Sequence, residues 1–396
     1  IPPQTSTIAS HLPKAVGTAF GIGLSKKLKL SGKLEPDSIV MCSFGDASIN
    51  HSTAQGAFNS ACWSARQGAW MPILFVCEDN AIGISTKTPK DWVQDNFECR
   101  PDMKYFYADG LNIFHTLEVT KKAADYVRRE KKPAFLHMDC VRLYGHAGPD
   151  MPSSYLSDAE IEEIEANDPL LHSARLLVEH GMMTAEDILK LYNDIGADIA
   201  KQSEKAETAK RLETSQEVME SLIPPKIKAP RARKITNKDR QAHFGSDWKF
   251  FKEPQHMARL LNWALHDLML EYPEIVMVGE DIGPKGGVYN ITSKCHARFG
   301  SPRVINSLLD EQSILGLSIG MAHNGLLPIP EIQFLAYLHN AEDQLRGEAA
   351  TLSFFSNGQY TNPMVIRIAG LAYQKGFGGH FHNDNSIAVL RDIPGL

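Results

Sequence analysis

Polar residues that can bind a metal ion follow two apolar runs in the first third of the chain. Asp46 comes shortly after the run SIVMCSF (38–44), and Asn80 comes directly after the run MPILFVCED (71–79). A carboxylate at the end of a buried strand is strongly disfavoured unless a cation or hydrogen-bond donors meet it. Because right-handed crossovers bring the carboxyl ends of parallel strands to one edge of a sheet, we expect Asp46 and Asn80 to be neighbours.

The residue types at this edge indicate a magnesium site. A carboxylate, an amide oxygen and a nearby backbone carbonyl suit Mg²⁺, which keeps its other coordination positions for water and substrate phosphates. The sequence therefore predicts a metal ion that holds a diphosphate. The alternative is structural, since Gly-Asp and Asp-Asn are also common turn dipeptides. Their position at the ends of successive strands favours the metal site.

The first 150 residues predict a parallel sheet with helical crossovers. Helix-like segments at 12–28 and 52–65 alternate with strand-like runs at 38–44, 71–79, 111–118 and 133–141. Such alternation is typical of α/β folds. From about residue 157 to residue 223 the sequence is helical and highly charged, and Ser157 with acidic residues after it is a good helix start. We expect a solvated helical arm there.

A second α/β pattern occupies residues 253–396. Its expected helices are 256–272, 311–325 and 339–355, and its expected strands are 274–281, 327–334, 362–370 and 386–390. Residues 224–252 are rich in proline and basic residues with weak periodicity, which predicts a linker. The chain is thus expected to be an α/β protein with two parallel-sheet domains, 1–223 and 253–396.

Composition limits the classes of partner. The 396 residues are 43% hydrophobic and 22% charged, with a net charge of −6, so the chain offers no basic field for nucleic acid. No apolar run approaches the roughly 20 residues of a membrane span, and no signal-peptide pattern opens the chain. The six cysteines are scattered, which favours a reduced, cytoplasmic protein. Because the sequence begins with Ile1 rather than methionine, we expect a piece of a longer protein.

The motif residues resemble those of a known family. GDA (45–47) and DN (79–80) are similar to the Gly-Asp-Gly and Asn-Asn motif of the thiamin-diphosphate-dependent first component of 2-oxo acid dehydrogenase complexes, of the pyruvate and branched-chain type. The resemblance implies two domains of the transketolase-like, thiamin-diphosphate-binding fold. Ala47 replaces the last glycine of the motif, and the spacer at 48–78 is longer than in the family. An insertion at a helix-to-strand loop is readily tolerated.

The resemblance implies thiamin diphosphate and Mg²⁺ as cofactors. Asp46, Asn80 and the backbone carbonyl of Ile82 would be the metal ligands. Ile8, in the segment STIASHLPKAVGTAFG (6–21), and Ile84 would bend the coenzyme into its V shape. The implied cofactor-binding residues are Gly45, Asp46, Ala47, Ser48, Asn80, Ile82, Ile84, Ile8, Gln333 and Tyr337.

The second half resembles the beta subunit of the same family. Residues 278–283, 303–322, 330–350 and 365–386 follow that subunit in order. The resemblance implies that alpha-like and beta-like parts are fused in one chain, and that the C-terminal domain of the beta subunit is absent from this sequence. Glu280 would lie at the contact between the two halves.

Glu311, in LDEQSILG, matches the glutamate that activates the coenzyme in this family. A carboxylic acid at that position stabilises the imino form of the aminopyrimidine, while the carbanion chemistry belongs to the cofactor. The alternative is that Glu311 only helps to start an apolar helix, as acidic residues do. Tyr337 matches the aromatic residue that stacks on the aminopyrimidine, beside Gln333, and Phe334 is a weaker candidate.

Two histidines complete the implied catalytic set of Glu311, His146 and His382. His146 lies in VRLYGHAGPD (141–150) and His382 lies in HFHNDN, where His380 competes for the same role. Two such histidines can stabilise charge on a bound 2-oxo acid and pass protons. Ala147 follows His146 where regulated members carry a phosphorylatable serine, so that switch is not expected.

The resemblance implies oxidative decarboxylation of a 2-oxo acid and reductive acylation of a lipoyl group on the lipoyl domain of an acyltransferase component. In the family the site lies between halves from different protomers, which implies a homodimer. Two alternatives stay open. A transketolase-like carbon–carbon ligase would transfer to sugar phosphates rather than to lipoamide, and a non-catalytic scaffold of the same fold would bind the cofactor without releasing carbon dioxide.

Overall fold

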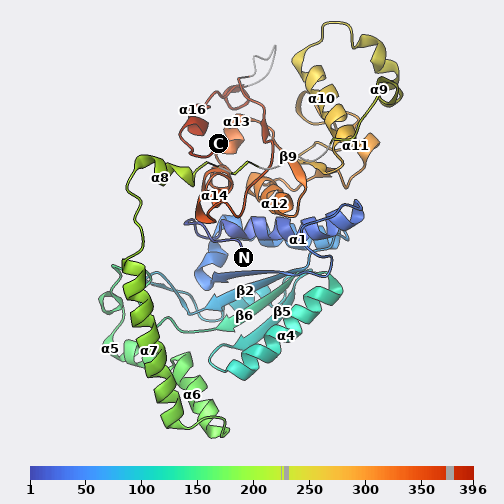
Figure 1. The fold of residues 1–396 in the computed structure, drawn as a ribbon. Coiled ribbons are helices and arrows are strands. Elements are labelled where there is room, and N and C mark those ends of the chain that lie inside the picture. Colours follow the sequence, from blue (N-terminus) through green and yellow to red (C-terminus); the bar gives the residue numbers. More distant parts are fainter. Residues whose placement is uncertain (224, 227–231, 372–378) are drawn as a thin grey trace. The chain divides into compact units, whose positions relative to one another are not determined.

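The computed structural model of the chain describes residues 1–223, 225–226, 232–371 and 379–396 (Figure 1). They form two compact units. The large unit comprises Ile1–Val40, Asn50–Ile73 and Ser221–Leu396, and the small unit comprises Met41–Ile49 and Leu74–Glu220. This division does not follow the predicted domain boundaries, because the first helix (His11–Lys27) packs mainly against the helix Glu311–His323, and the second helix (Ser52–Arg66) packs against both. The boundaries at 223 and 253 stay a prediction.

The small unit is built on a four-stranded sheet of order β1-β2-β6-β5. The strands are β1 (Val40–Gly45), β2 (Ile73–Asp79), β6 (Ala134–Asp139) and β5 (Lys104–Asp109). β6 is parallel to both β2 and β5, and Asp79 lies opposite Asp139. The first five residues of β2 are buried, as in a parallel strand covered on both faces. The carboxyl ends of β2, β6 and β5 therefore meet at one edge.

One predicted strand of this unit is wrong. Residues 111–118 begin helix α4 (Ile113–Glu130), which packs against β5 and β6. The side chain of Asn112 accepts hydrogen bonds from the backbone N–H groups of Phe114 and His115, and this N-cap starts the helix in spite of the β-branched residues. The strand in this region is instead β5, which the sequence analysis did not predict.

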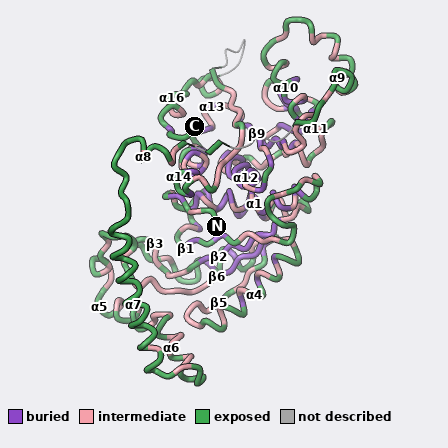
Figure 2. The backbone as a smooth tube through the Cα atoms, viewed as in Figure 1, coloured by how far each residue is buried: buried purple, intermediate pink, exposed green. Residues whose placement is uncertain are grey.

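The helical arm of the small unit is highly exposed. It contains α5 (Asp158–Ala166), α6 (Pro169–Glu179), α7 (Ala185–Glu207) and α8 (Ser215–Glu220), and no residue of these helices is buried (Figure 2). Ser157 and Thr184 start α5 and α7 with capping boxes. The remaining short elements are β3 (Ile82–Gly83), β4 (Thr86–Lys87), α3 (Trp92–Phe97) and the 3-10 turn η2 (Pro152–Ser154).

The large unit contains a second parallel sheet, of order β10-β9-β7-β8. Its strands are β7 (Ile275–Gly279), β8 (Val304–Asn306), β9 (Leu327–Ile332) and β10 (Arg367–Ile368). Its helices are α1 (His11–Lys27), α2 (Ser52–Arg66), α9 (Asn237–Phe244), α10 (Met257–Glu271), α11 (Cys295–Phe299), α12 (Glu311–His323), α13 (Leu335–Leu338), α14 (Leu352–Phe355), α15 (Gly379–His382) and α16 (Ala388–Arg391). Further turns are η3 (Gly245–Phe250), η4 (Val288–Asn290) and the π-helical η5 (Gln344–Ala349).

The predicted strand at 386–390 is also wrong, because most of it belongs to helix α16. Asp384 Oδ1 accepts the backbone N–H of Ser386, which makes a turn in place of an extended entry. The segment predicted as a linker, 224–252, lies partly outside the described residues. Within it, α9 and η3 pack on α10, where the ring of Phe251 stacks on Trp263 at 4.1 Å.

Helices α1 and α12 pack at very short distance through glycine. A Cβ atom on Gly17 would lie 2.4 Å from the carbonyl oxygen of Leu317, and one on Gly320 would lie 2.2 Å from that of Lys14. No side chain can occupy these positions without moving the helices apart. The contact fixes Glu311, the first residue of α12, relative to the N-terminal helix.

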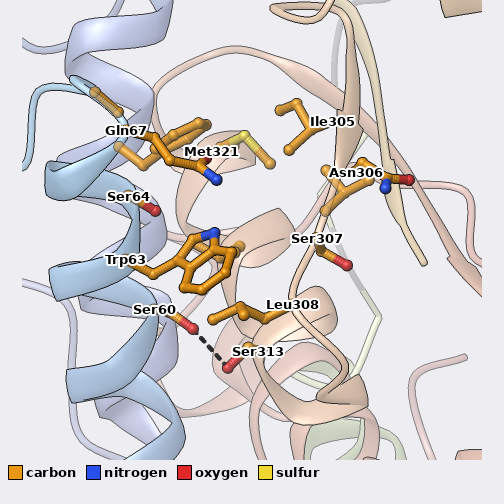
Figure 3. A pocket seen from close by; sticks show the side chains of 14 residues that line it. Ser60, Trp63, Ser64, Gln67, Ile305, Asn306, Ser307, Leu308, Ser313 and Met321 are labelled. Atoms are coloured by element: carbon orange, nitrogen blue, oxygen red, sulfur yellow. Dashed lines mark hydrogen bonds between the residues drawn. The ribbon is translucent and has the colours of Figure 1, made fainter. Parts of the chain in front are cut away.

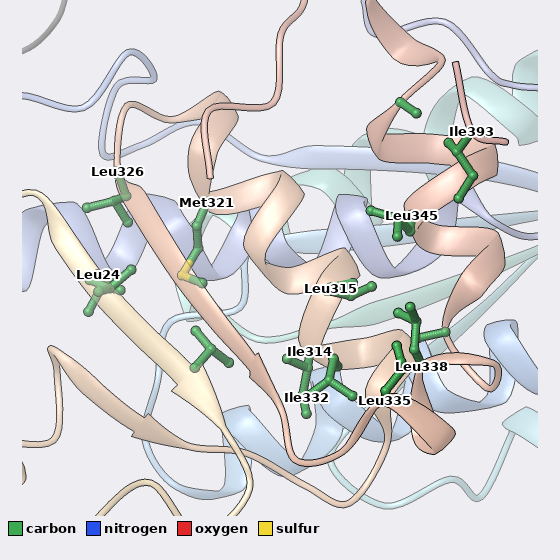
Figure 4. Close-up of a cluster of buried hydrophobic side chains, with 14 residues drawn as sticks. Leu24, Ile314, Leu315, Met321, Leu326, Ile332, Leu335, Leu338, Leu345 and Ile393 are labelled. Carbon is green, nitrogen blue, oxygen red and sulfur yellow. The ribbon is translucent and has the colours of Figure 1, made fainter. Parts of the chain in front are cut away.

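The apolar core of the large unit lies between α12, the sheet and the C-terminal helices (Figure 4). Ile314, Leu315 and Met321 of α12 meet Ile332 of β9 and Leu24 of α1 there. This core holds the carboxyl ends of β7 and β9 in place. No described helix combines the length and the apolar character that crossing a membrane requires.

Candidate functional site

Asp46 and Asn80 lie together at the carboxyl edge of the small unit's sheet. Asp46 is 1% exposed, and its carboxylate accepts the backbone N–H groups of Ala47 and Asn80. Thr88 donates its hydroxyl to Asp46 Oδ2. Burial raises the pKa of Asp46, and the nearby Asp79 carboxylate adds to the rise. A bound cation would offset both effects, because it stabilises the charged carboxylate.

The turn after β2 presents the other predicted ligands. Asn80 Oδ1 accepts the backbone N–H of Ile82 at 3.2 Å, and this bond leaves the amide oxygen a second lone pair. Ala81 and Ile84 both have positive φ angles, 59° and 56°. For a β-branched residue such as Ile84 this conformation costs about 1–3 kcal/mol. Its side chain is nevertheless 59% exposed, and an exposed apolar group on a strained backbone is typical of a functional position.

The donor set fits a magnesium ion. All three groups are hard oxygen donors, from Asp46, Asn80 and the Ile82 carbonyl. Ala47, which departs from the family's motif, is accommodated by Gly83, since a Cβ atom on Gly83 would lie 2.4 Å from the Ala47 Cβ. Gly45 ends β1, and Ser48 lies in the 3-10 turn η1 (Asp46–Asn50) beside Asp46.

His146 lies in an exposed loop that is tied to the same turn. Its backbone N–H donates to Asp150 Oδ2 at 2.7 Å, and Tyr155 donates to the same oxygen. Arg142, in the same loop, donates to the carbonyl oxygen of Ile84 at 2.7 Å. The loop that carries His146 is therefore fixed to the residues that follow Asn80.

Glu311 lies at the carboxyl edge of the second sheet. It is 9% exposed, and Asn340 Nδ2 donates to its Oε2 at 2.8 Å. Glu280, directly after β7, has its pKa raised to about 7 by burial, by Glu311 and by the acids at 281 and 310. Glu280 Oε1 is buried and has no hydrogen-bond partner among the described residues. Such an orphaned carboxyl oxygen is the kind of group that a ligand satisfies.

Aromatic rings cluster in the segments that follow β9 and contain His382. Phe334 and Tyr337 follow β9, and the ring of His382 lies 4.4 Å from that of Phe334 and 6.4 Å from that of Tyr337. Gln333 Nε2 reaches the Glu280 carbonyl oxygen at 3.5 Å. His380 is exposed, and its ring is tilted against that of Phe381 at 4.2 Å. Of the two competing histidines, His382 is therefore the one beside the predicted aromatic residues.

The predicted residues are divided between the two units. Ile8 belongs to the large unit, just before α1, with a side chain 53% exposed. The small unit holds Gly45, Asp46, Ala47, Ser48, Asn80, Ile82, Ile84 and His146, and the large unit holds Ile8, Glu311, Gln333, Tyr337 and His382. The role of each residue stays a prediction.

The sequence analysis missed several side chains that support these groups. Thr88 contacts Asp46, Asn340 contacts Glu311, and His137 contacts Asp79. Thr88 and Asn340 carry no local signal, because each is an ordinary polar residue in a loop. A histidine inside the apolar run AFLHMD of β6 is a signal that could have been used.

A small cavity of the large unit is lined by other residues. It measures about 70 Å³ and opens between α2 and the segment after β8, beside the 2.9 Å hydrogen bond between Ser60 and Ser313 (Figure 3). Trp63 and Leu308 line it. None of the predicted site residues is in its lining. The predicted site residues are therefore not those that line this cavity.

Sequence comparison decides the family. The sequence model of the family described as "Dehydrogenase E1 component" matches residues 4–215, more than half of the chain. The chain belongs to the dehydrogenase E1 component family. Residues 253–396 match the model described as "Transketolase, pyrimidine binding domain". The E1 component match contains Asp46, Asn80 and the other predicted residues of the small unit, together with Ile8 of the large unit. The pyrimidine-binding match contains Glu311, Gln333, Tyr337 and His382.

Curated relatives of this E1 component chain match about a third of it. The 2-oxoisovalerate dehydrogenase subunit beta of Pseudomonas aeruginosa is 36% identical over 134 residues, 33% of this chain and 37% of the relative. The pyruvate dehydrogenase E1 component subunit beta of Staphylococcus epidermidis is 34% identical over 145 residues, 35% of this chain and 42% of the relative. The chain thus spans well under half the length of these relatives.

A solved structure supports the fold. The transketolase of Campylobacter jejuni superposes with a TM-score of 0.53 at 15% identity, covering 98% of this chain and 56% of that one. With its parallel sheets, the chain therefore has the predicted α/β, transketolase-like fold. Membership of the E1 component family implies thiamin diphosphate as the cofactor.

Proposed function

We propose that this chain is the alpha-like and beta-like part of a fused E1 component that decarboxylates a 2-oxo acid and reductively acylates a lipoyl group. The observation that carries the proposal is the contact between Asp46 and the Asn80 backbone at the edge of a parallel sheet, in the match to the E1 family. The second support is Glu311, buried and hydrogen-bonded to Asn340, in the pyrimidine-binding match.

Asp46, Asn80 and the Ile82 carbonyl would hold Mg²⁺ and, through it, the diphosphate of the coenzyme. Ile84 and Ile8 would support the bent coenzyme with apolar contacts, and Tyr337 would cover its aminopyrimidine. When bound, thiamin diphosphate supplies a nucleophilic carbon and accepts the electron pair that decarboxylation releases. The protein supplies the orientation of the ring and the protons.

Glu311 is the proposed proton partner of the aminopyrimidine. Asn340 donates to its Oε2, so Oε1 is the oxygen that we assign to the proton shared with the ring nitrogen. His146 and His382 would bind the carboxylate and carbonyl oxygens of the 2-oxo acid and move protons during transfer. The partners that we propose are a 2-oxo acid, the lipoyl domain of an acyltransferase component and a second copy of the chain.

The test is a panel of carboxyl-labelled 2-oxo acids. Pyruvate, branched-chain 2-oxo acids and 2-oxoglutarate are incubated with the protein, Mg²⁺ and thiamin diphosphate, with a lipoyl domain as acceptor. We expect labelled carbon dioxide and acylated lipoyl domain from one substrate class, and neither product when thiamin diphosphate is left out.

Two results would contradict the proposal. Transfer of a two-carbon unit between sugar phosphates without lipoyl acylation would favour a transketolase-like ligase. Binding of thiamin diphosphate without release of carbon dioxide from any of the 2-oxo acids would favour a scaffold of the same fold.

A further inference from the structure

A buried histidine lies next to the turn that carries Asn80 and Ile82. His137, on β6, is 5% exposed, and its Nε2 lies 2.9 Å from Asp79 Oδ2. Asp79 directly precedes Asn80. We propose that His137 is a positioning residue, which fixes this turn for metal binding through Asp79; the inference rests on the function proposed above.

The hydrogen-bond partners of His137 define its tautomer. An ionised Asp79 only accepts, so Nε2 of the ring must carry the proton that it shares with Oδ2. In the neutral ring Nδ1 is then an acceptor, and Tyr105 donates its hydroxyl to Nδ1 at 2.7 Å. Burial raises the pKa of the Tyr105 hydroxyl, which therefore stays protonated as a donor. His137 is held on both sides.

Asp79 passes this constraint to the metal turn. Its Oδ1 accepts the backbone N–H of Ala81 at 2.9 Å, while its backbone carbonyl accepts the N–H of Cys140 at 2.8 Å. The side chain therefore holds Ala81, the residue with positive φ between Asn80 and Ile82. Loss of a residue that holds metal ligands in place without touching the metal typically lowers metal affinity by about 10–100-fold.

A direct metal site is the competing interpretation. Asp79, His137 and Asp139 offer three ligand atoms within 4.8 Å of one another. However, Nε2 is 3.5 Å from Asp139 Oδ1, longer than its 2.9 Å contact with Asp79. The Asp79 carboxylate is also already used by the Ala81 N–H. These contacts favour a hydrogen-bond network, and the experiment separates the two interpretations.

Three variants test the proposal. His137→Phe removes both hydrogen bonds, and His137→Gln keeps an amide N–H near the position of Nε2. Tyr105→Phe deletes a single hydroxyl group and serves as the test variant in case His137→Phe does not fold. His172→Phe in the arm is the control. The first measurement is amide hydrogen exchange of residues 79–88 without cofactor. The second measurement, made by calorimetry, is the Mg²⁺ concentration at which thiamin diphosphate binding is half-saturated.

In His137→Phe we expect faster amide exchange of residues 79–88 and a rise of about tenfold or more in the Mg²⁺ concentration that half-saturates thiamin diphosphate binding. In His137→Gln we expect both quantities to return most of the way to their wild-type values. Tyr105→Phe is expected to have a smaller effect of the same sign, and His172→Phe none. Unchanged exchange in both His137→Phe and Tyr105→Phe would overturn the proposal, even if the wild type binds no cofactor. A further measurement is the visible absorption of added Co²⁺. If wild type shows Co²⁺ bands that are absent in His137→Gln, the proposal is overturned in favour of a metal site.

Discussion

Asn340 donates a hydrogen bond to Glu311 across 2.8 Å, and this contact fixes the orientation of the carboxyl group that we assign to proton transfer. Glu311 begins α12, whereas Asn340 follows α13. The carboxyl edges of β8 and β9 bring the two residues together. The bond occupies Oε2, and Oε1 is the oxygen that we assign to the coenzyme.

Replacing Asn340 by alanine should slow decarboxylation without abolishing it. A hydrogen bond to a charged group contributes about 1.5–3 kcal/mol, which corresponds to a loss of about 10–100-fold in rate. The measurement is the rate of carbon dioxide release at saturating thiamin diphosphate. Asn167→Ala, at the end of α5, is the matched control and should leave the rate unchanged. A rate equal to wild type in Asn340→Ala would show that the orientation of Glu311 does not depend on this bond.

Glu280 should make the stability of the protein depend on pH. Its pKa in the folded protein is raised to about 7 from 4.5, so the folded state binds a proton that the unfolded state loses between these values. Stability should therefore fall as the pH rises from 4.5 through 7. Glu280→Gln should match wild type in thermal melting at acidic pH and melt at a higher temperature above pH 7. If the difference in melting temperature between Glu280→Gln and wild type were the same at every pH, Glu280 would not be the source of the pH dependence.

Loss of one member of the buried ion pair between Lys14 of α1 and Glu348 of η5 should strongly destabilise the protein. The two charged atoms are 2.6 Å apart, both side chains are almost fully buried, and Thr5 and Ser10 also donate to Glu348. Removing one member of a buried pair typically costs about 3–5 kcal/mol, because the other charge is left uncompensated.

We therefore expect Lys14→Met to lower the free energy of unfolding in guanidinium titrations by this amount. The double variant Lys14→Met with Glu348→Leu should lose less than Lys14→Met alone. Arg175→Ala, which breaks the exposed pair with Glu179, is the control and should change little. If Lys14→Met and Arg175→Ala have equal effects, loss of one member of the buried pair does not strongly destabilise the protein.

Glycine 320 should not tolerate a methyl group. Its Cβ would lie 2.2 Å from the Lys14 carbonyl oxygen and the Thr18 nitrogen, both of which are backbone atoms of α1. Gly320→Ala should therefore destabilise the protein by about 1–3 kcal/mol. Gly196→Ala in α7, where nothing lies within 4 Å, should instead stabilise it by about 0.5–1 kcal/mol. Chemical unfolding curves of the two variants should shift in opposite directions, and shifts in the same direction would contradict the close packing of α1 on α12.

The proximity of Asp46 and Asn80 could be predicted from the sequence because it depends only on two strands that are consecutive in the chain and on the direction of the crossover. The contact of His137 with Asp79 could not be predicted. It depends on the insertion of β6 between β2 and β5, and thus on long-range pairing that no local pattern records. The error at 111–118 had a local cause, since the Asn112 cap outweighed the β-branched residues.

The grouping of α1 and α2 with the C-terminal part also lay beyond the sequence analysis. Alternating helices and strands predicted one N-terminal domain, but Gly17 and Gly320 let α1 approach α12 far more closely than ordinary side chains allow. Glycine spacing on a helix does not identify the partner helix. Likewise, the support that Asn340 gives to Glu311 required the backbone path after α13, where the sequence shows only polar residues.

The most direct measurement of the central claim is the rate of carbon dioxide release from the preferred 2-oxo acid by wild type and Glu311→Gln, with thiamin diphosphate binding measured on the same samples. Glutamine keeps the shape of the side chain but cannot hold the proton. We predict that Glu311→Gln binds the coenzyme with Mg²⁺ and releases carbon dioxide at least about a hundredfold more slowly. Equal rates in the two proteins would contradict the assignment of Glu311 and, with it, the proposed enzyme.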